Sequence, residues 1–431
     1  MGEPVRVGLL GCGAVGGALL KLLHSDADLI TARCGLRFEV TRVAVRNLAK
    51  DRGVALAEGV LTHDAAAVAR DPDVDVVVEL IGGTEPARGL VTAALTAGKP
   101  VVTGNKELLA NFGRELSDLA SAHGVDLLYE AAVGGGIPLL RPLRESLAGE
   151  RIHRVLGIVN GTTNYILTQM TEEGASYADA LAEAQSLGYA EGDPTADVEG
   201  FDAAAKAAIL ATIAFGSEVM AGDVYREGIS AVTADDIEVA GRLGYVVKLL
   251  AVAESEGGTA GAAVGVRVHP AMVPKSHPLA SVRGSFNAVF IEGEAVGELM
   301  LYGRGAGGMP SASAVLGDLI DAAHNLRSGS TSPTPHRPRA SIVPIDQLST
   351  QYYLNVDVLD RPGVLASVAE VFGENRVSIR SMEQAGLGDD ARLIFITHTA
   401  QESDVQATVT GLHQLGAVKR VGSLLRVVGG E

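Results

Sequence analysis

Residues 5–23 read VRVGLLGCGAVGGALLKLL, and this stretch decides the fold of the 431-residue chain. The Val and Leu residues at 5–10 predict a strand, and the apolar spacing from Val15 onward predicts a helix. Further strand-like runs follow at 39–45, 74–80, 100–104 and 125–131. Strands that alternate with helices are typical of a doubly wound parallel sheet, so we expect the chain to begin with one.

Three glycines in this stretch form the pattern G-x-G-x-x-G, and Gly11, Gly13 and Gly16 each have a separate purpose in it. The first permits a tight turn, the second lets a pyrophosphate approach the backbone, and the third lets the helix pack on the strand. The phosphates then meet amide groups at the start of the helix, around Ala14 and Val15. We therefore expect dinucleotide binding; the alternative is a glycine-rich turn without a ligand.

The residues after the second predicted strand bear on the choice of dinucleotide. An NAD site usually has Asp or Glu there to bind the ribose hydroxyls, whereas this chain has Arg46, with Lys50 and Arg52 close behind. Cations at this place favour the 2′-phosphate of NADP. The spacing from the glycines is longer than usual, so Arg46 could instead be a solvated loop residue, and NAD is not excluded.

The composition limits the class of protein. With 47% hydrophobic and 20% charged residues, the chain should be an ordinary globular protein of about two to four domains. Its net charge of -17 argues against nucleic acid and anionic membranes as partners. No apolar run approaches the roughly 20 residues of a membrane span. Only Cys12 and Cys34 are present, without a signal-peptide pattern, so we expect a reducing cytoplasm and no structural disulfide.

Two later segments at predicted strand ends could carry chemistry. Lys106 lies in TGNKELLA, and ligands of doubly wound sheets bind beyond the carboxyl ends of the strands. A lysine in the first turn of a helix opposes the helix dipole, which favours a functional position over a surface one. In YEAAVGGGIPLL, residues 129–140, three glycines suit either close packing or a hard cation held by oxygen ligands, and the residues alone leave both open.

The segment GYAEGDPTADVEGFDAAAK places five carboxylates before its final residue, Lys206. Asp202 and Lys206 are spaced i, i+4 and so share a helix face, and Glu199, one turn earlier, is expected on nearly the same face. The helix beyond them is almost entirely apolar, which predicts that it is buried with Lys206 at its wet end. Such a lysine suits proton transfer, and Glu191, Asp193 and Asp197 could bind a substrate ammonium group. The alternative is an exposed row of ion pairs.

Asn160 and Thr162 lie between a predicted strand and a helix, in the stretch NGTTNYIL. Asn and Thr at this place cap a helix by default, and they can also hydrogen-bond a small polar substrate. Together with the lysine segments, they point to a nicotinamide-linked enzyme that acts on an amino acid.

Taken in order, these motifs resemble homoserine dehydrogenase. The glycine loop, TGNKE, YEAAVGGGIP, NGTTNYIL, the carboxylate-to-lysine segment, VHPAMVPKSHPLASV and YGRGAGGMPSASAVLGDL together cover roughly residues 5–325. The resemblance implies NAD(P)-dependent interconversion of L-homoserine and L-aspartate 4-semialdehyde, on the route to threonine, methionine and isoleucine. It also implies a homodimer or homotetramer. Because the first strand starts at Val5, we expect no preceding aspartate kinase domain and a monofunctional enzyme.

The resemblance also assigns site residues. Lys206 matches the proton-transfer lysine of the family, and Lys106 the second lysine, beside substrate and nicotinamide. Asp202 matches the aspartate that orients the substrate, and Glu191 the carboxylate that binds its ammonium group. Some members carry two adjacent acids where this chain has only Asp197, which we keep as a supporting residue.

The family further binds a monovalent cation, usually Na+, through a segment that this chain matches with Glu130, Val133, Gly135 and Ile137. The resemblance therefore favours a cation at the glycine run, held mostly by backbone oxygens.

The glycine-rich turn and helix at 302–325 return to the nucleotide domain in the family, so Gly305 and Gly307 should approach the cofactor. The fold class that follows is α/β, in several domains. We expect a Rossmann-type domain at 1–130, completed by 303–326, an α+β substrate and dimerisation domain at 131–302, and a Pro- and Ser-rich linker at 327–349.

The final segment, 350–431, has the β-α-β-β-α-β order of the ferredoxin-like plan. Its stretch DRPGVLASVAEVF resembles an ACT domain. The resemblance implies feedback control by an amino acid, with L-threonine as the expected effector, bound around Asp360, Gly363 and Asn375. The alternative is a domain kept only for assembly.

Two other functions remain open. One is a different NAD(P)-linked amino-acid oxidoreductase on a similar scaffold, which substrate-dependent oxidation of NADPH would distinguish. The other is a non-catalytic amino-acid sensor with a vestigial nucleotide domain. An intact glycine motif beside Lys106, Glu191, Asp202 and Lys206 argues against the sensor, which needs no such set.

Overall fold

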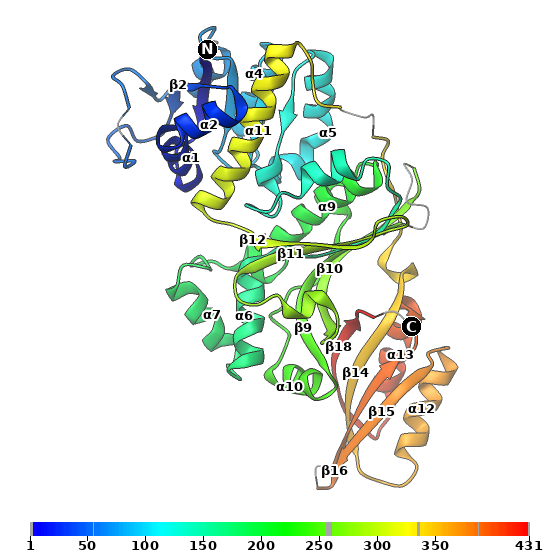
Figure 1. Ribbon diagram of the computed structural model, residues 1–431. Coiled ribbons are helices and arrows are strands. Elements are labelled where there is room, and N and C mark those ends of the chain that lie inside the picture. The colour runs from blue at the N-terminus through cyan, green and yellow to red at the C-terminus, as the bar shows by residue number, and fades with distance from the viewer. Residues whose placement is uncertain (1–2, 55, 256–260, 334–336, 387, 430–431) are drawn as a thin grey trace.

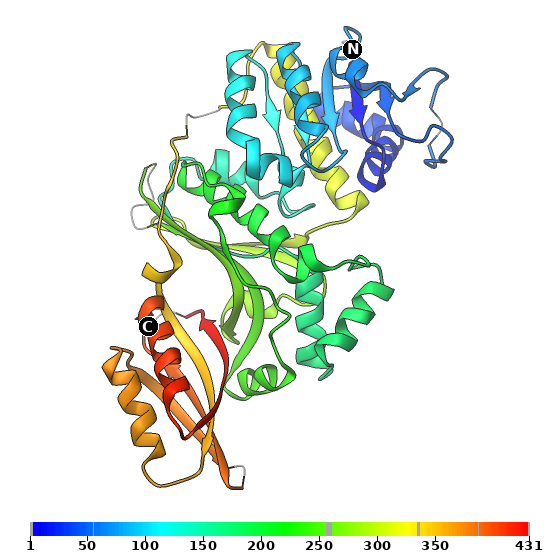
Figure 2. The ribbon, with the colours of Figure 1, turned by 180° about the vertical axis from the view of Figure 1, so that it is seen from behind.

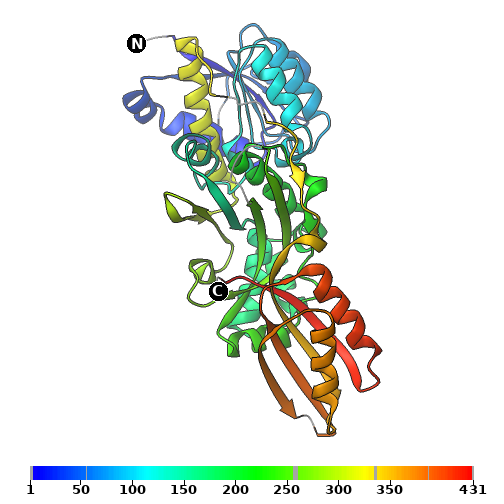
Figure 3. The ribbon, with the colours of Figure 1, turned by 90° about the vertical axis from the view of Figure 1, so that its right-hand side faces the viewer.

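The structure is a computed structural model that describes residues 3–54, 56–255, 261–333, 337–386 and 388–429. Three regions follow one another along an elongated molecule, from the N-terminal region in blue to the C-terminal region in orange and red (Figure 1). The same row is seen from the side (Figure 3). Among the described residues, no helix has the length and apolar character needed to span a bilayer.

The N-terminal region is the expected doubly wound parallel domain. Its strands lie in the order β3-β2-β1-β4-β5-β6, and every neighbouring pair is parallel. The strands are β1 (Val5–Leu10), β2 (Phe38–Ala44), β3 (Leu61–Thr62), β4 (Val76–Glu79), β5 (Val101–Thr103) and β6 (Leu127–Leu128). The helices are α1 (Ala14–Ser25), α2 (Ala27–Cys34), α3 (Ala65–Arg70), α4 (Ala87–Thr96) and α5 (Lys106–Ala122).

Helix α11 (Gly308–Ser328) returns late in the chain to pack against α1 and β5. In Figure 1 it is the yellow helix that crosses the blue and cyan elements. The helix buries Ala312, Val315 and Leu319 in the same core as the odd-numbered residues of β1. The N-terminal region is therefore built from two segments that lie almost two hundred residues apart in the sequence.

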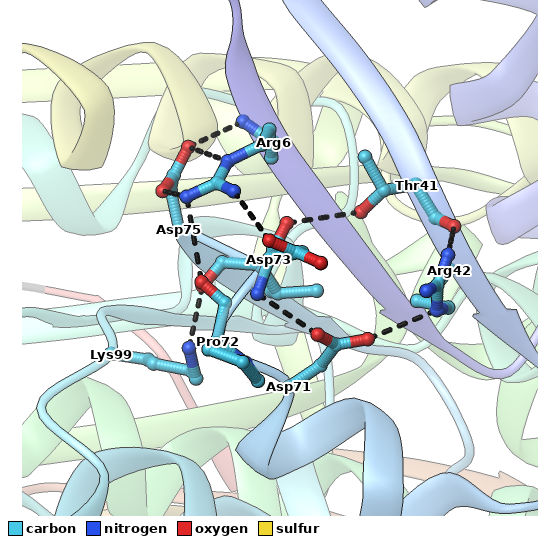
Figure 4. A network of polar contacts seen from close by, with 9 residues as sticks. Arg6, Thr41, Arg42, Asp71, Pro72, Asp73, Asp75 and Lys99 are labelled. Carbon is cyan, nitrogen blue, oxygen red and sulfur yellow. Dashed lines mark hydrogen bonds and ion pairs between the residues drawn. The ribbon is translucent and has the colours of Figure 1, made fainter.

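A polar network connects the strands at the end of the sheet opposite the glycine loop (Figure 4). The Arg6 guanidinium pairs with Asp75 at 2.7 Å and with Asp73 at 3.1 Å. Arg42 pairs with Asp71 at 3.0 Å. Nearby, the buried Lys99 donates to the carbonyl of Val74 at 2.6 Å. These contacts hold the β1, β2 and β4 ends in register and are remote from the candidate site.

The middle region is a mainly antiparallel sheet, to which short strands add parallel pairs, with helices on one face. Its strands run β12-β11-β7-β9-β10, with each neighbouring pair antiparallel. They are β7 (Ile152–Ile158), β9 (Tyr245–Ser255), β10 (Ala263–Pro274), β11 (Phe286–Gly293) and β12 (Gly297–Arg304), with the short β8 (Tyr225–Arg226) beside β10. The helices are α6 (Gly161–Glu172), α7 (Tyr177–Ser186), α8 (Thr195–Val198), α9 (Phe201–Phe215) and α10 (Ala234–Arg242).

Helix α9 lies between the N-terminal region and the middle sheet, as both broad views show (Figure 1 and Figure 2). It packs against α5 on one side and against β7, β9 and β10 on the other. Its alanines from Ala203 to Ala211 are buried because both neighbours approach closely. The helix predicted to be buried is therefore buried between two regions.

The C-terminal region has the predicted ferredoxin-like order. Its elements are β14 (Ser349–Leu359), α12 (Val364–Glu374), β15 (Ile379–Gly386), β16 (Asp390–Thr397), the short β17 (Ala400–Gln401), α13 (Glu402–Gln414) and β18 (Val418–Val427). Strand β18 also pairs in parallel with β10, where Ala271 faces Arg426 and Met272 faces Val427. The two sheets therefore form one continuous sheet, which the sequence did not predict.

The segment between these regions is not a free linker throughout. Helix α11 continues to Ser328, and β13 (Ser341–Ile342) pairs with β10. Residues 334–336 lie outside the described residues. The domain limits set from the sequence remain a prediction.

Candidate active site

Two charged side chains of the carboxylate-to-lysine segment meet on the first turns of α9. The Lys206 ammonium donates to Asp202 Oδ2 at 2.7 Å and to the carbonyl of Val159 at 2.7 Å. Only 9% of Lys206 is exposed. The helix can begin here because Gly200 has a φ of +79°, a conformation that glycine adopts without strain. The predicted i, i+4 pair is therefore formed, and it is buried rather than solvated.

Lys106 joins this pair from the N-terminal region. Asn105 caps α5 by accepting from the amide of Leu108, which places Lys106 in the first turn. The Lys106 ammonium lies 3.0 Å from Asp202 Oδ1, so the one carboxylate bridges two lysines. The cluster carries one net positive charge, which suits the negative oxygen of a reaction intermediate.

The protonation of the cluster follows from these contacts. Burial acts to raise the pKa of Asp202, but the ammonium groups of Lys206 and Lys106 outweigh it and hold that pKa below its usual range. Burial acts to lower the pKa of Lys106, and the Asp202 carboxylate outweighs it and raises that pKa. Asp202 is thus an anion and Lys106 a cation at neutral pH.

Asn160 connects the cluster to a second carboxylate. Its side-chain amide donates to Asp202 Oδ2 at 2.9 Å and to Asp197 Oδ1 at 2.7 Å. Its side-chain oxygen, Oδ1, caps α6 by accepting from the backbone amide of Thr163. Asn160 is therefore the helix cap that the default expectation gives, and its binding of substrate stays a prediction. The Thr162 hydroxyl donates to the carbonyl of Tyr189 and so anchors the acidic loop.

The other acids of the segment lie away from the lysines. Glu191 is exposed, and its carboxylate forms no hydrogen bond or ion pair with another residue that the structure describes. Glu199 precedes the start of α9 and accepts from the Ser230 hydroxyl. The expectation that Glu199 shares the face of Asp202 and Lys206 is wrong, because Gly200 interrupts the helix between them.

The glycine loop has the geometry that its pattern predicts. Gly11 has a φ of +93°, and a Cβ there would lie 2.7 Å from the Leu80 carbonyl oxygen. A Cβ on Gly16 would lie 2.6 Å from the Gly11 oxygen, whereas one on Gly13 would meet nothing within 4 Å. The open side of Gly13 leaves room for a pyrophosphate to approach the backbone.

A cleft of about 650 Å³ opens over this loop and is lined by Gly11, Gly13, Arg46, Lys50 and Arg52. A smaller hollow of about 220 Å³ runs from Gly13, Ala14, Val15 and Gly16 to Gly104 and Asn105. The space over the glycine loop thus extends to the residues next to Lys106. A dinucleotide bound along it would bring its far end to the lysine cluster.

The late glycine turn lies close to these elements. Gly305 is buried against the loop at 133–137, because a Cβ on Gly135 would lie 2.4 Å from the Gly305 oxygen. Gly307, with a φ of +128°, precedes α11. A Cβ on Gly308 would lie 3.0 Å from the Ala14 oxygen, and Gly308 lines a hollow with Gly13 and Ala14. Gly308 is a candidate cofactor residue that the sequence analysis missed, although it follows directly on the glycines named there.

The carbonyl groups at 133–137 are suited to a cation. The carbonyl oxygens of Val133, Gly135 and Ile137 accept no hydrogen bond from another described residue. The Glu130 carboxylate is already used, since it accepts from the amides of Leu139, Leu140 and Arg141. Within the described ranges, no group of three or more His, Cys, Asp or Glu side chains could hold a metal ion. A cation here would therefore depend on backbone oxygens.

The three residues predicted to bind an effector do not all lie close together in this chain. Gly363 caps the start of α12 and Asn375 follows its end. At about 1.5 Å per residue the two lie roughly 18 Å apart. Asp360 lies near Gly363, where its amide donates to the Asp389 carbonyl.

Family models match three parts of the chain. The model described as homoserine dehydrogenase matches residues 138–320, and the model of its NAD-binding domain matches residues 11–130. The ACT domain model matches residues 352–417.

Named relatives match over the whole length. A homoserine dehydrogenase of Corynebacterium glutamicum is 51% identical over 99% of this chain and 96% of its own. One of Mycobacterium tuberculosis is 48% identical over 99% and 98%. The crystal structure of a homoserine dehydrogenase from Thiobacillus denitrificans superposes with a TM-score of 0.92 at 43% identity, covering 99% of this chain and 98% of that one. A hyperthermophilic archaeal homoserine dehydrogenase in complex with NADPH covers 75% of this chain and 98% of its own, with a TM-score of 0.62 at 30% identity.

Proposed function

The chain belongs to the homoserine dehydrogenase family and is an NAD(P)-dependent oxidoreductase that acts on a CH–OH group, and on this premise we propose that it interconverts L-homoserine and L-aspartate 4-semialdehyde. The observation that carries the proposal is the Asp202 carboxylate, which bridges Lys106 and Lys206 at 3.0 and 2.7 Å. Interconverting an alcohol and an aldehyde requires a proton transfer at oxygen. The cluster provides it beside the cleft that begins at the glycine loop.

We propose NADP as the preferred cofactor, without excluding NAD. The free space over Gly13 and the cleft lined by Arg46, Lys50 and Arg52 fit a dinucleotide with an additional phosphate. The archaeal relative solved with NADPH supports this choice. When bound, the nicotinamide supplies the hydride in reduction and accepts it in oxidation. Gly305 and Gly307 are proposed to border the same site.

Lys206 is proposed to transfer the proton. In reduction its ammonium donates to the substrate oxygen, while Lys106 stabilises the negative charge that develops there. In oxidation Lys206 accepts the hydroxyl proton as a neutral amine. Asp202 keeps its charge, because its lowered pKa prevents it from exchanging a proton near neutral pH. Its part is to orient the two lysines and the substrate.

The substrate ammonium group is proposed to bind Glu191, with Asp197 in support. The exposed Glu191 carboxylate is free of contacts to other described side chains, and Asp197 is held toward the cluster by Asn160. Asn160 and Thr162 position these acids through the cap of α6 and the Tyr189 carbonyl. Binding at the ammonium end fixes the reacting carbon, and such positioning lowers a barrier by several kcal/mol.

A monovalent cation, Na+ in the first instance, is proposed at the carbonyl groups of Glu130, Val133, Gly135 and Ile137. The unpaired carbonyls of that loop support it. The loop contacts the turn at Gly305, so a cation there would stabilise the junction between the two glycine-rich segments.

From the family likeness we also propose that the protein is a cytoplasmic homodimer or homotetramer. On the same ground we propose that its reaction belongs to the route to threonine, methionine and isoleucine.

The ACT domain is proposed to impose feedback control by L-threonine. Support comes from a chain of contacts between this domain and the catalytic helix. Arg426 of β18 pairs with Glu227 at 3.0 Å. Two residues further along, the amide of Ile229 donates to the Val198 carbonyl at 2.8 Å. Val198 ends α8, directly before the turn into α9, so a shift of β18 has a short path to Asp202 and Lys206.

The test is the loss of absorbance of reduced nicotinamide with L-aspartate 4-semialdehyde, run with NADPH and NADH and with or without L-threonine. Rapid oxidation that is faster with NADPH and inhibited by L-threonine is the expected result. Cofactor binding without turnover would indicate another amino-acid dehydrogenase, and absent cofactor binding would favour a sensor. Turnover that L-threonine leaves unchanged would overturn the proposed control while keeping the reaction.

A further inference from the structure

A second hollow, of about 380 Å³, lies outside the candidate active site. It is bordered by Thr168 and Glu172 of α6, Lys248 of β9, and Lys275 and Arg283 from the connection between β10 and β11. Pockets for small ligands start at about 300 Å³, so its size suits a small molecule. None of these residues belongs to the proposed catalytic or cofactor sets.

Lys248 is a buried charge without a counter-ion. Only 4% of the residue is exposed. Its ammonium donates to Asn164 Oδ1 at 2.9 Å and to the Val282 carbonyl at 2.6 Å. An ammonium has three donors, so one N–H has no described partner. No carboxylate of a described residue lies within 4.0 Å of it. Burying a charge without a pairing partner is costly.

The pKa of Lys248 reflects the same lack of a counter-ion. Burial lowers the pKa of Lys248 to about 8, and the distant Glu172 carboxylate only partly offsets this. At neutral pH the side chain is therefore still an ammonium, held at a cost. A negatively charged ligand in the hollow would remove that cost.

The remaining charges around the hollow are mostly positive. Arg283 pairs with the only acid of the lining, Glu172, at 2.9 Å. Lys275 is exposed and donates to the Gly241 carbonyl at 2.8 Å, an uncharged partner. The hollow therefore has an excess of two positive charges in a protein whose net charge is -17. Such a local reversal of sign attracts anions.

We propose that this hollow is a binding site for a small oxyanion of phosphate or carboxylate type. The spare N–H of Lys248 donates to the ligand from inside the fold, and Lys275 approaches it from the rim. Because Lys248 is fixed by Asn164 and Val282, its donor needs no rearrangement to bind. The site is separate from the dinucleotide cleft, which is lined by different residues.

The test is calorimetric titration of the full-length protein with inorganic phosphate and, separately, with malonate, in chloride buffers of matched ionic strength. Saturable binding of one anion per chain is expected, and the arm with the higher affinity identifies the ligand type. Lys248→Met should weaken it by about 10–100-fold, the worth of a charged hydrogen bond. Lys275→Glu should also weaken the binding of the anion. Because Lys275 is exposed, this variant keeps the proposal testable if the buried variant Lys248→Met does not fold.

Two controls separate this site from others. Lys99→Met removes a buried lysine that donates to a carbonyl outside the hollow, and it should leave phosphate binding unchanged. Arg46→Ala changes the dinucleotide cleft, and the binding that depends on Lys248 should persist in it. Binding that Arg46→Ala removes and Lys248→Met does not would place the phosphate in the dinucleotide cleft and overturn the proposal. Weak binding that does not saturate, and that chloride shows to the same degree, would mean an adventitious ion only. That result would also overturn the proposal.

Discussion

Lys106 and Asp202 form an ion pair of 3.0 Å between the first turn of α5 and the first turn of α9. The pair joins the nucleotide-binding region to the substrate region, since the two helices pack together across that boundary. This contact therefore contributes both to the geometry of the lysine–carboxylate cluster and to the junction of the two regions. The cofactor and the substrate would be brought together at this boundary.

Replacing Lys106 by Met should reduce kcat by about 10²–10³-fold, as the loss of one oxyanion-stabilising donor does in other enzymes. The binding of NADPH should change little, because the adjacent cap Asn105 is unaffected. Steady-state kinetics together with fluorescence titration of NADPH check both parts. Lys99→Met serves as the matched control and should keep normal kcat. A Lys106→Met enzyme with normal kcat would remove Lys106 from the chemistry.

Asn160→Asp separates positioning from capping. Asp caps a helix about as well as Asn, so the cap of α6 is kept, and a loss of thermal stability in this variant comes only from the buried carboxylate beside Asp197 and Asp202. The new carboxylate cannot donate to Asp197 and Asp202 and repels both, so kcat should fall at least about tenfold. Asn160→Ala should in addition lose about 1 kcal/mol of stability with the cap. Kinetics and thermal unfolding of both variants are compared; a normal kcat in Asn160→Asp would show that Asn160 is only a cap.

Arg46 should determine cofactor choice. Arg46→Ala is expected to lower kcat/KM for NADPH by about 10–100-fold, the worth of a charged hydrogen bond to the 2′-phosphate. The value for NADH should stay nearly constant, since NAD has no group at that position. Parallel initial-rate measurements with the two cofactors decide the matter. Equal losses with both cofactors would mean that Arg46 does not read the 2′-phosphate.

Much of the nucleotide domain can be predicted locally. The strand expected at 5–10 is β1 (Val5–Leu10), because its Val and Leu residues are followed at once by the glycine turn. The two-residue strand β3 (Leu61–Thr62) was not predicted, since so short a run carries no periodicity. Strand β9 was also not singled out, because both of its faces are buried and its apolar run does not alternate.

Contacts between distant segments could not be predicted from local pattern. The pairing of β10 with β18 joins residues about 155 apart and leaves no trace in either strand's composition. The same holds for the ion pair of Lys106 with Asp202. The error at Glu199 has a different origin, because helical spacing was counted through Gly200, whose positive φ starts the helix anew.

Stability should depend on pH through Lys248. Burial lowers its pKa to about 8, whereas an unfolded lysine titrates near 10.4. Between these values the unfolded chain binds the additional proton, so the free energy of unfolding rises with pH. Relative to Lys248→Met, the wild type should gain at most about 3 kcal/mol from pH 8 to 10.5. Urea unfolding in chloride buffer measures this; a difference that does not vary with pH would contradict it.

The most direct test of the account is the turnover of Lys206→Met with L-aspartate 4-semialdehyde and NADPH, measured alongside its affinity for NADPH. Because Lys206 is the proposed proton donor, kcat should fall by about 10²–10⁴-fold. The dissociation constant for NADPH should stay within about threefold of the wild-type value, since the glycine loop is untouched. A variant that retains about a tenth or more of wild-type turnover would show that another group transfers the proton.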